Sequence, residues 1–209
     1  VADWLDLPKS GVHRMLVTLI ERGWAAQDPV TGFYRLTMHR AVLGQKFYAA
    51  TGVADACQPL LDRLASDSRE FVRLAVYDGH ALVWIAHAQG AVGNVGLVYQ
   101  PADTSGGVPL HATASGKAWL ASLTQEQAVQ CVLREGGFER AERFGPKVVR
   151  TVEALLADLK LTRTRGYGLA VEEAEPGVTA IGAAIRGAAA GPGVGTVSVA
   201  GPSVRMTAS

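Results

Sequence analysis

The sequence of 209 residues contains few cysteines and no long apolar run, and both shortages restrict the kinds of protein it can encode. Cys57 and Cys131 are the two cysteines; they lie far apart and form no C-x-x-C spacing. This argues against a disulfide framework or a zinc ribbon and favours a reducing, cytoplasmic setting. No apolar stretch approaches the roughly 20 residues of a membrane span, and no basic segment precedes an apolar one at the start. We therefore expect a globular chain with no membrane partner and no export signal.

Net charge is also scarce, at +1. The first 50 residues carry six basic against four acidic side chains, and the remainder carries 14 against 15. This asymmetry is too mild to indicate nucleic acid by itself. The hydrophobic content of 48% is ample for the core of one large domain or two small ones.

Signatures of catalysis are missing. The sequence has no G-x-S-x-G and no H-E-x-x-H. Glu172 and Glu173 are adjacent, so on a strand they point to opposite faces and cannot act as a paired acid and base. Ser115 and Lys117 are two positions apart, so on a helix they do not face each other. We expect no enzyme, no cofactor and no metal, although a hydrolase site can escape detection in a single sequence. The histidines, none at metal-ligand spacing, are His13, His39, His80, His87 and His111.

The segment VPLHATASGKAWLASL, residues 108–123, looks like the end of a phosphate-binding loop, but its spacing does not fit one. Such a loop reads G-x-x-x-x-G-K followed by Ser or Thr. His111 stands where the first glycine belongs, and Ala118 where the magnesium-binding hydroxyl belongs. GPGVG at 191–195 likewise has the wrong spacing for a dinucleotide fingerprint. The segment is therefore interpreted as a helix start of small residues, which either admits a ligand carboxylate or packs closely on a sheet, with Lys117 solvated or packed and not a ligand.

The first 36 residues have the pattern of two helices followed by a hairpin. Apolar residues recur at helical spacing after Pro8, and Gly23 ends that helix. The segment DPVTG then forms a turn between two short strands. The pattern predicts a helix-turn-helix with a two-stranded wing. The helix end, turn, second helix and two strands are placed at 1–5, 6–7, 8–22, 24–27 and 33–36.

This order fits a domain that places its second helix in the major groove of DNA and its wing on the backbone. Side chains at the start of the helix would contact phosphates or base edges, and His13 and Arg14 are the predicted base readers. An amphipathic helix with a basic outer face is common in other proteins too, so the helix alone does not decide the question. The predicted DNA contacts are Lys9, Ser10, Gly11, His13, Arg14 and Arg35.

A helical stretch from His39 to Ala50 follows and carries Val42, Leu43 and Phe47 on one face. This apolar stripe either packs on a partner chain or is buried within its own chain. TGVAD interrupts the stretch before a second helix. The stretch is suited to a linker between two domains.

The second half alternates strands and helices. Asp78-Gly79 predicts a hairpin turn in which both positions have positive φ. Thr124 and Gln127 predict a capping box, and Gly166 predicts a helix end. Hairpins at both ends with helices between them favour an α+β domain with a mainly antiparallel sheet. Strands are predicted within 71–88 and at 95–100, 167–173, 178–186 and 195–201, and helices at 56–66, 113–122, 124–134 and 151–165.

Five segments in register, LPKSGVHRMLVTLIERGW, DPVTGFYRL, PLHATASGKAWLA, RGYGLAVEEAEPGV and SVAGPSVRMT, give the chain a resemblance to the isocitrate lyase regulator (IclR) family of bacterial transcription factors. The resemblance implies a winged helix-turn-helix DNA-binding domain at residues 1–38, without its first helix. It further implies a linker helix at 39–52 and a GAF-like effector-binding domain at 53–209. Transcription regulation would then depend on homodimers, or on dimers paired into tetramers, that bind double-stranded operator DNA. The rival interpretations are a stand-alone small-molecule sensor and an unrecognised small-molecule enzyme.

The resemblance also implies where a small-molecule effector binds. An acidic position of some members is Ala170 here, a frequent cysteine is Ala180, and the second of two serines is Ala200. Because each departure replaces a polar group with a methyl, we expect a carboxylate effector more apolar than a small keto acid, such as an aromatic acid. Ser115, Gly116 and Ser198 are expected to anchor it. The full set of expected effector contacts is Leu97, Val108, Ala114, Ser115, Gly116, Ala170, Ala180, Ser198 and Ala200.

Overall fold

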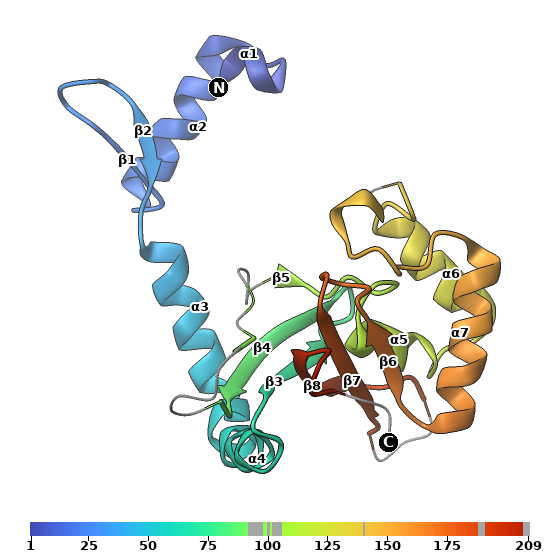
Figure 1. The fold of residues 1–209 in the computed structure, drawn as a ribbon. Coiled ribbons are helices and arrows are strands. Elements are labelled where there is room, and N and C mark those ends of the chain that lie inside the picture. The colour runs from blue at the N-terminus through green and yellow to red at the C-terminus, as the bar shows by residue number, and fades with distance from the viewer. Residues whose placement is uncertain (92–97, 100, 102–105, 140, 188–190, 207–209) are drawn as a thin grey trace. The chain divides into compact units, whose positions relative to one another are not determined.

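The computed structural model describes residues 1–91, 98–99, 101, 106–139, 141–187 and 191–206, and the chain divides into two compact units (Figure 1). The first unit is Val1–Asp55 and the second is Ala56–Ser209. Among the described residues, no helix combines the length and the apolar character that spanning a membrane requires.

The first unit is a helix-turn-helix with a two-stranded wing and a further helix. Asp6 adopts the left-handed conformation, with φ 52°, which makes the tight connection between the first two helices. In the wing, the Asp28 carboxylate accepts from the amides of Val30 and Thr31, and Ala26 pairs with Arg35 in antiparallel register. The predicted order of elements is confirmed. The elements are α1 (Ala2–Leu5), α2 (Lys9–Glu21), β1 (Ala25–Gln27), β2 (Tyr34–Leu36) and α3 (His39–Ala50).

Helix α3 has no buried residue. The three apolar side chains of its predicted stripe, Val42, Leu43 and Phe47, are 46%, 50% and 73% exposed. We predicted that this stripe either packs on a partner chain or is buried within its own chain. Burial within its own chain is not found among the described residues.

The second unit is a six-stranded sheet with helices, and every recorded strand pair is antiparallel. The strand order is β5-β4-β3-β8-β7-β6, which confirms the predicted α+β architecture. The strands are β3 (Phe71–Tyr77), β4 (Leu82–Gln89), β5 (Gly106–Gly107), β6 (Gly168–Val171), β7 (Val178–Ile185) and β8 (Gly195–Pro202). The helices are α4 (Val53–Ser68), α5 (Ala114–Leu120), α6 (Gln125–Arg134) and α7 (Val152–Arg165), with a 3-10 turn at Ala141–Arg143.

Local signals in the sequence place the helix ends correctly. The Thr124 side chain accepts from the Gln127 amide at 3.2 Å while the Gln127 side chain accepts from the Thr124 amide, which is the predicted capping box. Gly166 ends α7 in the left-handed conformation, with φ 83°. These bonds satisfy helix-end groups that would otherwise lack partners.

The hairpin between β3 and β4 differs from the prediction. Tyr77 pairs with Leu82, so the turn has four residues and not two. Gly79 has a φ of 96°, whereas Asp78 stays out of the positive region. The prediction of two positive φ angles is wrong because the Asp78 carboxylate stabilises a longer turn. It accepts hydrogen bonds from the backbone amides of His80 and Ala81, at 2.9 Å each. The strand predicted at 95–100 lies mostly outside the described residues.

Helix α5 lies next to β6 and β7, with α7 beside it (Figure 1). Two glycines allow this close approach. A Cβ on Gly168 would lie 2.2 Å from the Ala114 carbonyl oxygen, and one on Gly182 would lie 2.8 Å from the Ala114 carbonyl carbon. Because both neighbours are backbone atoms, no side-chain rotation relieves the clash. The sheet and the start of α5 are therefore in backbone-to-backbone contact.

We expect Gly168→Ala to displace α5 and to lower the free energy of unfolding of the full-length protein by about 1–3 kcal/mol, the usual cost of overpacking. Urea denaturation measures this difference. Gly107→Ala is the matched control, since nothing lies within 4 Å of the position its Cβ would take in the same sheet. Equal stability of the Gly168→Ala variant and the wild type would show that the contact yields without cost.

Candidate functional site

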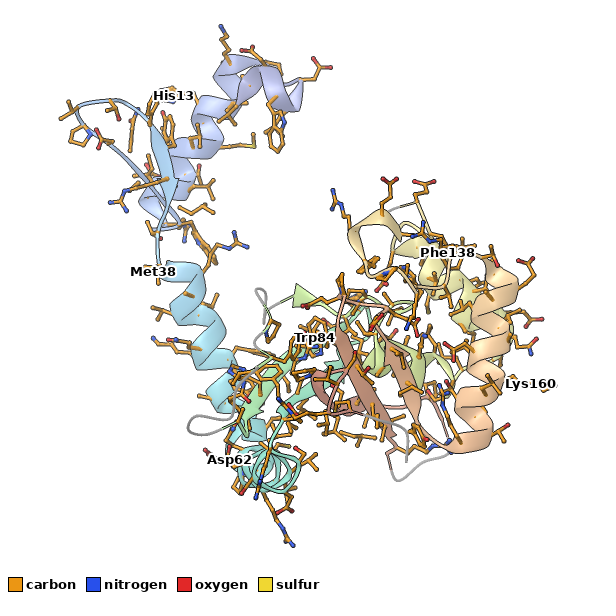
Figure 2. All side chains as sticks on the ribbon, in the orientation of Figure 1. His13, Met38, Asp62, Trp84, Phe138 and Lys160 are labelled. Atoms are coloured by element: carbon orange, nitrogen blue, oxygen red, sulfur yellow. The ribbon has the colours of Figure 1, made fainter. Side chains whose placement is uncertain are left out.

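The outer face of α2 presents the side chains that were predicted to contact DNA. Lys9, Ser10, His13 and Arg14 are all exposed, and Figure 2 labels His13 on this helix. Among the described residues, no carboxylate lies within 4.0 Å of the Lys9 or Arg14 side chains. Their charges are thus available to a phosphate backbone.

Gly11 and Arg35 complete the predicted DNA-contacting set. Nothing lies within 4 Å of the position that a Cβ on Gly11 would take, so packing within the described chain does not require glycine there. Arg35 is exposed on β2, one position beyond the residue that pairs with the last residue of β1. Whether these residues touch DNA stays a prediction.

One face of the sheet in the second unit gathers several of the residues that were expected to bind an effector. Residues directly opposite each other in antiparallel strands place their side chains on the same face, and so do residues two apart along a strand. Two neighbouring rows across β6, β7, β8 and β3 therefore share this face. The rows read Ala170, Ala180, Ala200 and Phe71, and Gly168, Gly182, Ser198 and Arg73.

The start of α5 lies over the second row. A Cβ on Gly182 would lie 2.9 Å from the amide nitrogen of Ser115. The Thr113 hydroxyl caps the helix by accepting from the Gly116 amide at 3.0 Å. The amides of Ala114 and Ser115, at the start of the same helix, have no acceptor among the described residues. The contact brings Ala114 and Ser115 to the same face of the sheet as Ser198.

Close packing explains other expected contacts without any ligand. A Cβ on Gly116 would lie 2.4 Å from the Leu110 backbone, and its amide is already bonded to Thr113. Val108 is 1% exposed and belongs to the core cluster that includes Leu110. Of the two interpretations left open for this segment, close packing is found at Gly116, and binding of a ligand carboxylate at the helix start stays a prediction. Leu97 lies outside the described residues.

Sequence reasoning missed an aromatic and cationic group on the same sheet face. Arg73 in β3 is 8% exposed, and its guanidinium lies 4.0 Å from the ring centroid of Trp84, which comes from β4 (Figure 2). Tyr99 packs edge-on to Phe71 and donates its hydroxyl proton to Glu175 at 2.9 Å. A basic residue inside the apolar run FVRLAVY was the one signal in the sequence for this group.

Burial shapes the electrostatics of this group. It lowers the pKa of Arg73, while Tyr99 and the Glu175 carboxylate act in the opposite direction. Burial also raises the pKa of Tyr99 well above its usual value. Four buried side-chain polar atoms have no hydrogen-bond partner among the described residues: Arg73 Nε, Trp84 Nε1, Thr196 Oγ1 and His111 Nε2. Such atoms are rare and each calls for an explanation.

Lys117 is fully buried and forms ion pairs with Asp158 and Glu173. Arg165 contacts the other oxygen of Asp158 at 3.3 Å. Burial raises the pKa of Glu173, and the Lys117 ammonium opposes that shift. Of the two predicted alternatives for Lys117, solvated or packed, the structure shows the packed one, because α5 approaches the sheet too closely to leave its side chain in water.

Glu172 and Glu173 lie just beyond the end of β6 and not on a strand as predicted, and Glu172 has a φ of 53°. Glu172 pairs with Lys147 at 3.2 Å, on the surface, whereas Glu173 pairs with the buried Lys117.

Comparison with known proteins identifies what the chain resembles. Residues 45–209 match the family described as "Bacterial transcriptional regulator IclR C-terminal", and residues 1–29 match the "IclR helix-turn-helix domain". The chain is 34% identical over 207 residues to the HTH-type transcriptional regulator BhcR of Paracoccus denitrificans, across 99% of this chain and 71% of that protein. It is 29% identical over 211 residues to the transcriptional repressor IclR of Escherichia coli, across 99% and 73%.

Solved structures share the fold. One is the crystal structure of an IclR homologue complexed with 4-hydroxybenzoate from Microbacterium hydrocarbonoxydans, with a TM-score of 0.70 and 24% sequence identity. The similarity covers 100% of this chain and 81% of that chain. At this identity the likeness concerns the fold.

We expect Lys117→Met to lower the free energy of unfolding by about 3–5 kcal/mol, because it leaves the buried Glu173 carboxylate without its cation and removes one of the two cations that pair with the half-buried Asp158. Adding Glu173→Gln should recover part of the loss, since a neutral amide needs no counter-charge. Urea denaturation of the full-length variants measures both effects. Lys147→Met, which removes an exposed lysine paired with the neighbouring glutamate, should cost less than about 1 kcal/mol. Similar losses for the two Met variants would contradict a special role for the buried pair.

Proposed function

Because the chain belongs to the IclR family of bacterial transcriptional regulators, we propose that residues 1–38 bind operator DNA, residues 39–52 link the domains, and residues 53–209 bind a small-molecule effector. The observation that carries this proposal is the match of both family domains, in order, along the chain. We infer that the protein acts by binding and not by catalysis, and the names of its relatives as regulators and repressors support this inference.

The DNA contacts come from α2 and the wing. The side chains of Lys9 and Arg14 are exposed and have no ion-pair partner in the described part of the chain, which favours α2 as the recognition helix. Ser10 and His13 are exposed on the same helix. Arg35 extends the contact to the backbone beside the groove. Two copies in a dimer, or four in a pair of dimers, would bind the two halves of a pseudo-palindromic operator in the cytoplasm.

The effector is a carboxylate with an apolar body, and an aromatic acid fits best. The row of Ala170, Ala180 and Ala200 offers methyl groups, and Phe71 and Tyr99 pack against Ala200 in one apolar cluster. The Microbacterium hydrocarbonoxydans homologue, whose structure is a complex with 4-hydroxybenzoate, shows an acid of this class on the same fold. Ser198, with Ala114 and Ser115 close by, supplies polar contacts.

Regulation requires that the effector bind the DNA-competent and DNA-incompetent states with different affinity. The coupling would pass through α3, which connects the two domains. The exposed apolar stripe of α3 gives it a surface that can pack differently in the two states.

We expect Arg14→Ala to weaken operator binding by about 1–3 kcal/mol and to relax specificity at one base pair, the usual effect of losing a bidentate contact to a base. Fluorescence anisotropy on the operator and its single-base variants measures both effects. Arg63→Ala is the control, because Arg63 is an exposed arginine of the second unit. An unchanged footprint and unchanged base preference would refute the role of Arg14.

We expect benzoate to bind more tightly than glyoxylate or pyruvate. Polar atoms of a short keto acid that are buried against the three alanines would lose their hydrogen bonds, at about 1–3 kcal/mol for each unpaired group. Isothermal titration calorimetry on the full-length protein compares the three acids. Ala200→Ser should reduce the difference in affinity between benzoate and the short keto acids, because it adds a hydroxyl that can bond their polar atoms. Binding of the short acids without binding of benzoate would overturn the proposed effector class.

A further inference from the structure

Arg73 is a buried cation that forms no direct ion pair with any of the described residues. Its side chain is on the sheet face described above, and the residue is 8% exposed. No carboxylate of the described residues lies within 4.0 Å of it. Buried arginines are almost always paired, because an unpaired buried charge is costly. The Glu175 carboxylate favours the charged form of Arg73. However, the described residues form no direct ion pair with this guanidinium.

The nearest acid is engaged elsewhere. The Glu175 carboxylate accepts a hydrogen bond from the Tyr99 hydroxyl at 2.9 Å, and Glu175 is itself exposed to solvent. The Tyr99 backbone carbonyl in turn accepts from the Gln89 side chain at 3.0 Å. These bonds hold Tyr99 beside Arg73 but leave the guanidinium without an ion pair.

The guanidinium is held in a fixed orientation. It stacks on Trp84, 4.0 Å from the ring centroid, and lies 5.6 Å from the ring centroid of Phe71. Arginine stacked on an aromatic face keeps its planar fork of donors free for a carboxylate in the same plane. Arg73 Nε has no acceptor among the described residues, and neither has the indole nitrogen of Trp84. Two donors on neighbouring strands of one sheet face therefore lack an acceptor among the described residues.

The position opposite Arg73 carries a hydroxyl. Arg73 and Ser198 are direct partners across β3 and β8, so their Cβ atoms are about 5 Å apart on one face. The next row begins with Phe71 and Ala200, which belong to the apolar cluster with Tyr99. A charged anchor, a hydroxyl and an apolar wall therefore lie side by side.

We propose that Arg73 binds the carboxylate of the effector in a bidentate ion pair, with Ser198 as its neighbour and Trp84 as its platform. The body of the effector then lies along Ala200 and Ala180. This inference rests on the proposed function for the existence of an effector. It moves the main anchor from the start of α5, expected from sequence, to β3. An aromatic monocarboxylate combines the charge and the flat apolar surface that these residues require.

Arg73→Met separates a binding role from a structural one without any ligand. Replacing a buried, unpaired charge by an apolar side chain of similar length is neutral or stabilising, whereas removal of a structural cation destabilises. We expect the ligand-free variant to melt at or above the wild-type temperature in differential scanning calorimetry. Arg165→Met, which removes an arginine paired with Asp158, should melt below it. A large fall in the melting temperature for Arg73→Met would overturn the proposal.

Calorimetric titration with benzoate and with its neutral isostere benzamide tests the ion pair directly. The wild type should prefer benzoate by at least about tenfold, and Arg73→Met should lose at least about tenfold in benzoate affinity while its weak affinity for benzamide is unchanged. Arg73→Lys keeps the charge but not the fork, and should lie between the two. Arg63→Met, at an exposed arginine of α4, should bind benzoate like the wild type.

Each result has a definite meaning. Equal affinity of the wild type for benzoate and benzamide, absence of benzoate binding, or full benzoate affinity in Arg73→Met would each overturn the role of Arg73. Operator binding measured alongside by fluorescence anisotropy separates this inference from the proposed function. If benzoate changes operator affinity equally in the wild type and Arg73→Met, effector control stands and the inference fails. If benzoate binds through Arg73 but operator affinity is unchanged, the inference stands and effector control by this class of acid fails.

Discussion

In the second unit the backbone of α5 lies directly against β6 and β7, and the other features of the candidate effector site depend on this contact. Glycines at positions 168 and 182 permit it, because any side chain there would meet the backbone of Ala114. The contact sets the start of α5 over the row that contains Ser198. It also removes Lys117 from water, so that a lysine in the first turns of the helix needs carboxylates from α7 and from the end of β6.

Among the described residues of this unit, two buried cations, Lys117 and Arg73, have opposite kinds of surroundings. Lys117 has two carboxylates and so is satisfied by the fold itself. Arg73 stacks on an aromatic ring, but the described residues give it no carboxylate. A satisfied buried charge holds elements together, whereas an unsatisfied one lowers stability unless a ligand completes it. By this contrast, Lys117 stabilises the fold, whereas Arg73 is the residue we propose to bind a ligand.

Much of the fold was readable from local patterns. The turn at Asp6, the capping box at Thr124 and the helix end at Gly166 depend on residues a few positions apart, so the sequence signals them directly. The hairpin at Asp78 was predicted in place but not in type, because the carboxylate of an Asp can stabilise turns of more than one length. The site was readable only in part. Resemblance pointed to Ser198 and the three alanines, while Gly116 is explained by its packing on Leu110.

The order of elements, the family and the outward-facing polar surface of α2 can be predicted from periodicity and from motifs of neighbouring residues. The environments of Lys117 and Arg73 depend instead on tertiary contacts. Lys117 meets Glu173 across 56 positions of the chain, a pairing that no local spacing encodes. The neighbours of Arg73 are set by strand register, which places Ser198 opposite it and the Trp84 ring against its guanidinium. Burial and pairing are properties of distant segments brought together, and so the chemistry of both cations appears only in the folded chain.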